Sequence, residues 1–328
     1  VLNSLTIFKN PRGTVFKVSP EQVVELEKLL EERKGIKDDE KKKEVYTRKD
    51  FLEEVFMDQS TYDRLVNLLR TKKNIILQGP PGVGKTFIAK RLAFSMIGEK
   101  DTDRVQIVQF HQSYSYEDFI MGYRPSNNGF ELARGSFYLF CRKAEQDPDR
   151  EYFFIIDEIN RGNLSKILGE LFMLMEPDKR GEKLRLLYSE EMFTVPNNVY
   201  IIGTMNTADR SLAMIDYALR RRFAFFTLKP AFESEGFKKF LAKNGSSSAK
   251  LETLINKVKE LNEEIKEDPS LGEGFEIGHS YFCVGSTVTD EWLRDVVEFE
   301  LIPLLKEYWF DNRKNVERWA SELRSVLT

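Results

Sequence analysis

The chain has 328 residues, enough for two domains with a large buried core, and it needs no disulfide staples. Its 50 basic and 53 acidic residues give a net charge of -3, which does not support nucleic-acid binding through bulk positive charge. Two cysteines and two histidines exclude a His-rich metal centre and argue against structural zinc, and no apolar run approaches the roughly 18 residues of a membrane span. We therefore expect a cytoplasmic protein without a membrane segment.

The first 44 residues are predicted to form a helix and an exposed linker. Ser19 as N-cap and Gly35 as a stop signal predict a helix over 19–35. The mixed charge run "KGIKDDEKKKE" (34–44) follows, and a solvated extension of the helix is the alternative to a linker. The chain has no initiator Met, so we expect it to be a fragment of a longer protein.

After two more helix starts, at Thr47 and Ser60, the pattern changes to short apolar runs that predict strands. Five such runs occur, at 74–78, 105–110, 152–157, 199–203 and 223–228. Strands that are apolar on both faces and separated by helices indicate a parallel sheet covered on both sides. The expected fold class is α/β, with a doubly wound domain over 45–229.

Beyond Pro230 the apolar pattern becomes helical in four successive stretches. These predict a separate, all-helical domain over 230–328. Two insertions in the preceding domain, 123–137 and 178–198, are each expected to form a hairpin. Such hairpins either face a central pore, as in motor proteins, or are plain surface hairpins.

The segment "GPPGVGKT" (79–86) lies between a predicted strand and a predicted helix, which is the context of a phosphate-binding loop. Its glycines let backbone N–H groups turn toward phosphate oxygens, and the helix N-terminus adds a favourable dipole. Lys85 supplies a positive charge for the outer phosphates, and Thr86 offers a hydroxyl to Mg²⁺. An ordinary glycine loop is the alternative. The expected nucleotide contacts are Gly79, Pro80, Pro81, Gly82, Val83, Gly84, Lys85, Thr86 and Phe87.

Two acidic residues at the end of the apolar run "YFFIIDE" complete the predicted site. Asp157 is expected to coordinate Mg²⁺, and Glu158 to act as the general base for an attacking water. The run "MNTADRS" (205–211) ends another strand, and ligands of doubly wound sheets bind outside the carboxyl ends of the strands. Asn206 is therefore expected to orient the water or to contact the γ-phosphate. Solvated acids and a plain surface turn are the alternatives to these interpretations.

Together these motifs resemble the AAA+ family, and more narrowly its McrB branch, the motor subunits of modification-dependent (type IV) restriction systems. Four segments carry the narrower resemblance: "QFHQSYSYEDFIMGYRP" (109–125), "MNTADRS" (205–211), "DYALRRRF" (216–223) and "GFEIGHSYF" (274–282). The resemblance runs from about residue 45 to the C-terminus. It implies a P-loop AAA+ parallel-sheet domain followed by a helical lid. Residues 1–44 carry no motif that we assign to a family, and they are expected to be the remnant of an upstream DNA-binding domain or a linker.

The resemblance also implies an activity and partners. McrB-type proteins are GTP-dependent, hexameric motors that work with a nuclease subunit, McrC, and translocate DNA before it is cut. Asp209 lies in the stretch that the family uses to contact the nuclease subunit. Arg221 and Arg222 match arginines that reach a neighbouring subunit's nucleotide, and Arg161 matches another arginine that acts in trans. We therefore expect Mg²⁺ and GTP as ligands, with DNA bound by an N-terminal domain that this chain lacks.

The lid departs from the usual AAA+ pattern at one position. Where other AAA+ lids place an arginine on the phosphates, this chain has His279, for which we weigh nucleotide contact against a packed structural role. The run N-K-x-D, with which small GTPases recognise guanine, does not occur in the sequence. From residue chemistry alone the expected nucleotide is therefore ATP, and the expected preference for GTP rests on the resemblance. Two alternatives stay open: an AAA+ ATPase of MoxR or dynein-like type that remodels proteins, and a nucleotide-gated scaffold without hydrolysis.

Overall fold

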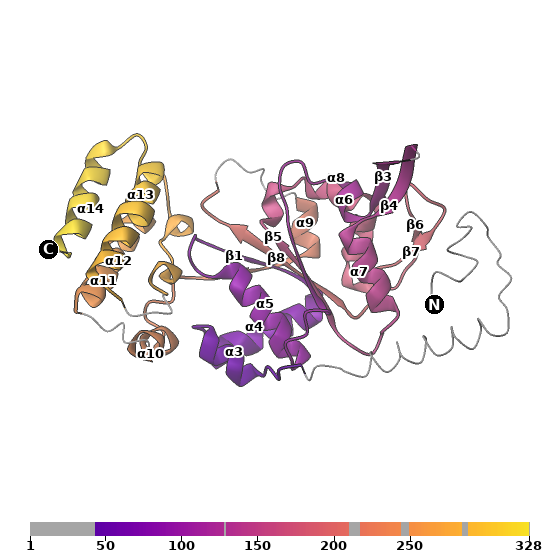
Figure 1. The fold of residues 1–328 in the computed structure, drawn as a ribbon, viewed down its shortest axis with the longest axis horizontal. Coiled ribbons are helices and arrows are strands. Elements are labelled where there is room, and N and C mark those ends of the chain that lie inside the picture. The colour runs from indigo at the N-terminus through magenta and orange to yellow at the C-terminus, as the bar shows by residue number, and fades with distance from the viewer. Residues whose placement is uncertain (1–42, 128, 210–216, 244–248, 284–287, 328) are drawn as a thin grey trace, which may run out of the picture. The chain divides into compact units, whose positions relative to one another are not determined.

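The computed structural model describes residues 43–127, 129–209, 217–243, 249–283 and 288–327 (Figure 1). Val45–Thr328 form one compact unit. The helix expected over 19–35 lies outside the described residues, as do Arg210 and Ser211 of the run 205–211. Within the described ranges, no helix combines the length and apolar character that crossing a bilayer requires.

Two helices precede the sheet, and their starts depend on capping side chains. Helix α3 (Arg48–Glu54) begins at the predicted capping box of Thr47. The predicted cap at Ser60 is wrong, because α4 (Gln59–Lys72) is capped by Asp58. The carboxylate of Asp58 accepts a backbone N–H of the first turn at 2.9 Å, and a carboxylate is a strong N-cap acceptor.

The five predicted strands form one parallel sheet. They are β1 (Asn74–Gly79), β2 (Val105–Gln109), β5 (Tyr152–Asp157), β8 (Val199–Asn206) and β9 (Ala224–Thr227). Their order is β2-β5-β8-β1-β9, and every neighbouring pair is parallel. Strands β5, β8 and β1 are therefore side by side, and their carboxyl ends meet at one edge of the sheet. The polar residues that follow these strands are brought together there.

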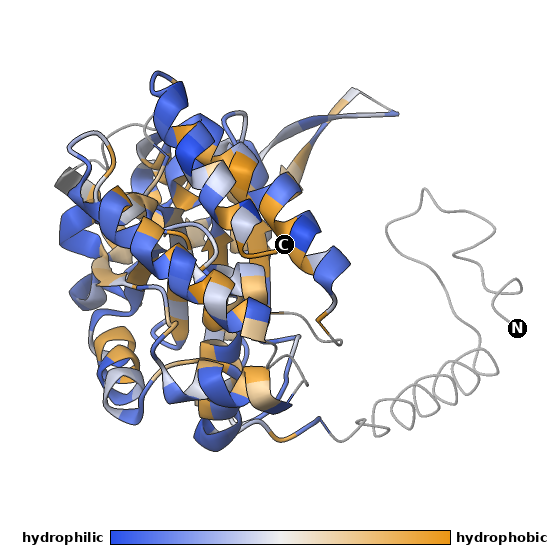
Figure 2. Cartoon of the chain, turned by 90° about the vertical axis from the view of Figure 1, so that its left-hand side faces the viewer, coloured by the Kyte–Doolittle hydropathy of each residue, from blue (hydrophilic) through white to orange (hydrophobic). Residues whose placement is uncertain are grey.

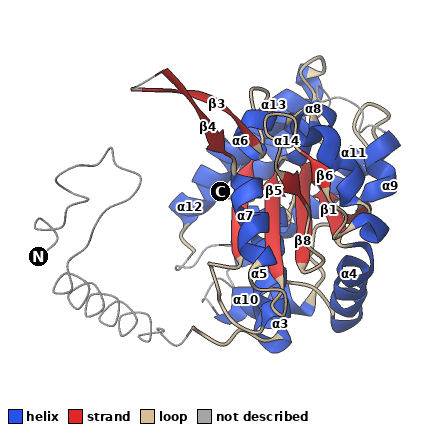
Figure 3. Cartoon of the chain, turned by 90° about the vertical axis from the view of Figure 1, so that its right-hand side faces the viewer, coloured by secondary structure: helices blue, strands red, loops and turns tan. Residues whose placement is uncertain are grey.

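Both faces of the sheet are buried under helices (Figure 3). Alternate residues of β5 belong to different cores: Phe154 packs in the core that includes α6 to α9, and Phe153 in the core that includes α3 to α5. This explains why β5 is apolar at every position from Tyr152 to Ile156 rather than at every second one. The helices that follow strands are α5 (Lys85–Ile97), α6 (Tyr116–Phe119), α7 (Ser136–Glu145), α8 (Leu164–Leu168) and α9 (Tyr217–Arg222).

Both predicted insertions form antiparallel hairpins. Strands β3 (Met121–Ser126) and β4 (Gly129–Arg134) lie between α6 and α7 and project away from the sheet (Figures 1 and 3). Strands β6 (Leu184–Arg185) and β7 (Met192–Phe193) form a shorter pair before β8. Three 3₁₀ segments, Ile159–Arg161, Gly169–Met175 and Pro177–Lys179, lead from β5 toward this second hairpin.

The C-terminal part is all helical, as predicted, and has its own core. Its helices are α10 (Glu235–Lys243), α11 (Ala249–Glu267), α12 (Asp290–Asp295), α13 (Ile302–Tyr308) and α14 (Arg313–Ser325), with a π-helical turn, Val296–Leu301, between α12 and α13. Short 3₁₀ segments at Glu273–Phe275 and His279–Phe282 precede α12. Along these helices, hydrophilic and hydrophobic residues alternate as expected for helices with one buried face (Figure 2).

Candidate nucleotide site

The phosphate-binding loop connects β1 to α5, as the sequence predicts. Gly82 and Gly84 both have φ of 76°, a left-handed conformation that other residues adopt only with strain. Gly84 is the residue immediately before α5, so the first backbone N–H groups of that helix point out of its N-terminus. This arrangement suits an anion, because free amides and the helix dipole act at the same place.

Lys85 is folded against the loop that it follows. Its ammonium group donates to the carbonyl oxygens of Gly79 and Pro80, at 3.0 and 2.9 Å, and the residue is only 9% exposed. Burial lowers the pKa of Lys85 to about 8, although the nearby carboxylates of Glu158 and Asp157 oppose this shift. Phosphate oxygens are stronger partners for an ammonium than neutral carbonyls, so a bound nucleotide would replace these contacts.

Asp157, at the tip of β5, is held by two hydroxyl groups. Thr86 donates its Oγ1 proton to Asp157 Oδ1 at 2.6 Å, and Thr204 donates to the same oxygen at 2.5 Å. The two residues expected to hold Mg²⁺ therefore lie within hydrogen-bond distance of each other. A carboxylate and a hydroxyl are the hard oxygen donors that Mg²⁺ prefers, so these two residues fit that ion.

Glu158 has a strained backbone and three polar neighbours. Its φ and ψ are 52° and 47°, and a non-glycine residue in this left-handed region costs on the order of 1–3 kcal/mol. Its N–H donates to Thr204 Oγ1 at 3.2 Å, and its carboxylate accepts from Asn206 Nδ2 at 2.6 Å and from Arg161 Nε at 3.3 Å. Burial raises the pKa of Glu158, and Arg161 opposes that shift. A partly desolvated carboxylate of this kind is suited to accept a proton.

Arg161 and Asp209 lie at the same edge. Arg161 Nη2 donates to Asp209 Oδ2 at 3.4 Å, so this arginine bridges Glu158 and Asp209 within one chain. The Arg161 side chain is nevertheless 46% exposed. It is therefore accessible to a second molecule.

Of the three arginines that end α9, the two predicted to act in trans, Arg221 and Arg222, differ in their surroundings. Arg222 forms an ion pair with Glu176 at 2.8 Å, and its guanidinium lies 4.2 Å from the centre of the Phe172 ring. Its side chain is 16% exposed. Arg221, in contrast, is exposed. Of the two, Arg221 has the freer access to a neighbouring molecule.

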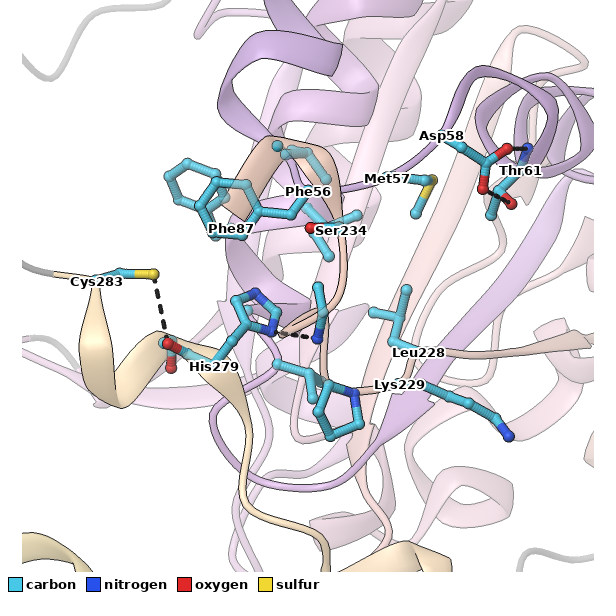
Figure 4. A pocket seen from close by; sticks show the side chains of 18 of the residues that line it. Phe56, Met57, Asp58, Thr61, Phe87, Leu228, Lys229, Ser234, His279 and Cys283 are labelled. Carbon is cyan, nitrogen blue, oxygen red and sulfur yellow. Dashed lines mark hydrogen bonds between the residues drawn. The ribbon is translucent and has the colours of Figure 1, made fainter. Parts of the chain in front are cut away.

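A cavity of about 1030 Å³ opens beside the loop, between α3, α10 and the start of the lid (Figure 4). Val83, Gly84 and Phe87 of the predicted site line it, together with the aromatic ring of Phe56. Sequence patterns do not single out Phe56, because an aromatic residue between two helices is usually part of a core. The cavity is bounded by the phosphate loop at one end, so it has the position and size for the base and sugar of a nucleotide.

His279 also lines this cavity, but as a buried, uncharged residue. Its Nδ1 accepts the N–H of Ala231 at 3.0 Å, and its ring packs edge-on against Phe56 and Phe237. Because Nδ1 is an acceptor, the neutral ring carries its proton on Nε2. Burial lowers the pKa of His279 to about 4. The residue therefore packs the junction between the sheet domain and the lid and does not place a positive charge on the phosphates.

Backbone contacts tie the lid directly to the phosphate loop. Gly278 donates its N–H to the carbonyl oxygen of Pro81 at 2.9 Å, and Ser280 donates to that of Gly82 at 2.8 Å. A Cβ built on Gly278 would lie 2.0 Å from the carbonyl group of Gly82, so only glycine fits this approach. The position of the lid at this point is thereby fixed relative to the backbone of the loop.

The fold and this site define an AAA+ nucleotide-binding module of the P-loop class. Comparison with family models agrees: residues 74–223 match the AAA domain of the dynein-related subfamily, and residues 253–317 match the McrB alpha-helical lid domain. Residues 21–112 also match the IstB-like ATP binding protein family. With an AAA domain followed by an McrB lid domain, the chain is of the McrB type. This confirms both the family resemblance and the fold that were expected from the sequence.

Two curated relatives are similar to most of the chain. The Escherichia coli (strain K12) type IV methyl-directed restriction enzyme EcoKMcrB subunit is 53% identical over 292 residues, covering 86% of this chain and 64% of that protein. The Bacillus subtilis (strain 168) type II restriction enzyme BsuMI component YdiS is 25% identical, covering 75% of this chain and 81% of that protein. This chain thus spans less than two thirds of the length of the first relative.

Proposed function

We propose that this chain is the nucleotide-hydrolysing motor of a modification-dependent restriction complex. The observation that carries the proposal is the assembled site: Lys85 on the phosphate loop, Thr86 beside Asp157, and Glu158 held by Asn206. The 53% identity with the E. coli restriction subunit supports the biological role. The cytoplasm, where both cysteines stay reduced, is the proposed location.

The chemistry follows from the positions of these side chains. Thr86 and Asp157 would hold Mg²⁺, which supplies charge neutralisation for the phosphate oxygens. Glu158 takes the proton of the attacking water, and its raised pKa makes this transfer more favourable at neutral pH. Asn206 fixes the carboxylate of Glu158 and contacts the water or the γ-phosphate. Lys85 binds the outer phosphates.

GTP is the proposed nucleotide, and its support is the relationship to McrB-type proteins. The cavity beside Phe56 and Phe87 has room and aromatic surface for either purine. Direct titration with labelled GTP and ATP tests the preference: we expect at least about tenfold tighter binding of GTP, or about 1.4 kcal/mol. Equal binding of the two would overturn it.

The proposed assembly is a hexameric ring in which neighbouring subunits complete each site. Arg221 is exposed at the end of α9 and is the first candidate to reach a neighbour's nucleotide, with Arg161 as the second. Arg222 is proposed with them, although here it is paired with Glu176 of its own chain. An arginine from a neighbouring subunit stabilises the negative charge that spreads over a phosphoryl group during its transfer. In GTPases that receive such an arginine, it accelerates hydrolysis by about 10³- to 10⁵-fold.

The proposed partners are a McrC-type nuclease subunit and DNA. Asp209 is the residue proposed to contact the nuclease, and it is held at the sheet edge by Arg161. DNA would be bound by an N-terminal domain outside the described residues. Gel filtration with the nuclease subunit of the same system tests this: we expect a joint complex and faster GTP hydrolysis. Independent elution with unchanged hydrolysis would contradict it.

One alternative keeps a specific observation in its favour. The AAA domain matches the dynein-related subfamily, which suits an ATPase of MoxR or dynein-like type that remodels proteins. That reading predicts a preference for ATP and no nuclease partner, so the two assays above separate it from the main proposal. A scaffold without hydrolysis is disfavoured, because a scaffold has no need of the close Asn206–Glu158 contact.

A further inference from the structure

Thr204 lies within the apolar strand β8, and its side chain forms hydrogen bonds that are not part of the sheet's backbone pairing. It is 1% exposed, and its single hydroxyl has two partners, one at the tip of the neighbouring strand β5 and one just after it. The hydroxyl donates to Asp157 Oδ1 at 2.5 Å and accepts the N–H of Glu158 at 3.2 Å. One buried group therefore touches both of the acidic residues on which the proposed hydrolysis depends.

Strand β8 holds the turn after β5 through three of its residues. Gly203 leaves space for Ile159, since a Cβ on Gly203 would lie 2.8 Å from Ile159 Cδ1. Thr204 binds the backbone of Glu158, and Asn206 binds the carboxylate of the same residue at 2.6 Å. Thr204 and Asn206 lie on the same face of β8, because side chains two residues apart in a strand point the same way.

This arrangement accounts for the strained backbone of Glu158. A residue with φ of 52° keeps that conformation only where its surroundings fix it. The hydroxyl of Thr204 fixes the N–H end of the residue, and the amide of Asn206 fixes the carboxylate end. The direction of the Glu158 carboxylate is therefore set from β8 at two points.

The same hydroxyl also orients the proposed metal ligand. Thr86 and Thr204 both donate to Oδ1 of Asp157: Thr86 lies at the start of α5, which follows β1, and Thr204 lies on β8. Outer groups that orient a ligating carboxylate are worth about 10- to 100-fold in metal affinity or activity. The contact of Thr204 belongs to this class.

We propose that Thr204 is a positioning residue that sets both the Asp157 carboxylate for the metal ion and the Glu158 carboxylate for the water. The inference rests on the proposed hydrolysis at Asp157 and Glu158. It assigns to one hydroxyl an effect on metal binding, through Asp157, and an effect on the rate of the chemical step, through Glu158.

The test compares Thr204→Val, which removes the hydroxyl at nearly constant shape, with Thr204→Ser, which keeps it. Thr194→Val is the matched control: Thr194 is also buried, at 7% exposure, and its hydroxyl has no hydrogen-bond partner within the described part of the chain. For each protein, binding of a labelled, non-hydrolysable GTP analogue is titrated with and without Mg²⁺. The hydrolysis rate at saturating GTP and the melting temperature are measured as well.

We expect Thr204→Val to need about 10- to 100-fold more Mg²⁺ for half-maximal enhancement of nucleotide binding and to hydrolyse GTP at least about 10-fold more slowly. Binding without Mg²⁺ should stay within about threefold of the wild type, because the phosphate loop is intact. Thr204→Ser and Thr194→Val should resemble the wild type in all three measurements.

Two results would overturn the proposal: a wild-type Mg²⁺ requirement and rate in Thr204→Val, or equal impairment of Thr204→Ser and Thr204→Val. If Thr204→Val does not fold, Thr204→Cys replaces it in the same measurements, because the S–H group is only a weak hydrogen-bond donor. The same two results, obtained with Thr204→Cys, would then overturn the proposal. Absence of hydrolysis by the wild type itself would instead count against the proposed function, and the Mg²⁺ titration of binding would still test Thr204.

Discussion

Gly278 lies where the lid comes closest to the phosphate loop, and its replacement by alanine is a sensitive test of that contact. Its φ and ψ are -77° and 166°, a conformation that alanine adopts without strain. A Cβ on Gly278 would nevertheless lie 2.0 Å from the carbonyl carbon and oxygen of Gly82. Gly278→Ala therefore changes the distance between lid and loop and little else.

The size of the effect follows from that distance. Ordinary contact begins at 3.4 Å, so the lid and the loop must separate by about 1.4 Å. Such a separation removes the hydrogen bonds from Gly278 to Pro81 and from Ser280 to Gly82, each worth about 1 kcal/mol. Because the loop amides must be aligned to bind phosphates, we expect nucleotide affinity to fall about 100-fold, or about 3 kcal/mol.

The assay is a titration with fluorescently labelled GTP, with the melting temperature as a check that the variant is folded. Lys314→Ala is the control, because Lys314 is exposed on α14 and lines neither the phosphate loop nor the cavity. Its affinity should stay within about threefold of the wild type. If the Gly278→Ala protein folds and binds GTP with wild-type affinity, the contact between lid and loop at Gly278 is not required for nucleotide binding, and the reasoning is refuted.

Three further predictions concern charge. Since the pKa of Lys85 is lowered to about 8 and bound phosphate favours its ammonium form, binding takes up a proton above that pH. GTP affinity should therefore fall by up to about tenfold per pH unit above 8 in a titration series, and Lys85→Arg should remove this dependence; a flat profile for the wild type would contradict it. Lys85→Ala and Arg221→Ala proteins should each be inactive in GTP hydrolysis but regain partial activity when mixed, because some interfaces then pair an intact loop with an intact arginine. A mixture that stays inactive while mass measurement shows mixed rings would exclude Arg221 from acting in trans. His279, with its pKa lowered from 6.5 to about 4, stabilises the fold fully above pH 6.5, and this contribution of about 3 kcal/mol is lost as the pH falls from 6.5 to 4. In denaturant unfolding at those pH values, His279→Gln should lose less stability on acidification than the wild type; an equal loss would contradict the assignment.

The sheet could be predicted well from the sequence, because burial on both faces leaves a clear signal. Each of the five apolar runs became a strand of the parallel sheet. The end of β8 was predicted three residues too early, at Gly203, since the polar side chain of Thr204 ends the apolar run before the strand itself ends. Ser60 was predicted as the cap of α4, but Asp58, two residues earlier, also has a capping side chain, and only the structure shows that Asp58 is used.

The site was only partly predictable. Thr86 and Asp157 could be singled out from a local motif and a strand tip, and the structure places their side-chain oxygens 2.6 Å apart. Thr204 was missed because a buried threonine in an apolar strand has the same pattern as any β-branched strand residue. The ion pair between Arg222 and Glu176 joins segments about 46 positions apart, and no sequence spacing indicates such a contact.

The central claim is that Glu158 is the base of a hydrolytic site, and the most direct test is single-turnover hydrolysis of GTP in the presence of Mg²⁺ by wild type and Glu158→Gln. Glutamine keeps the shape of the side chain and an oxygen for Asn206 Nδ2, which lies 2.6 Å from Glu158 Oε1, but it cannot take a proton from water. We predict unchanged GTP affinity and at least about 100-fold slower hydrolysis. Equal turnover by the two proteins would contradict the account.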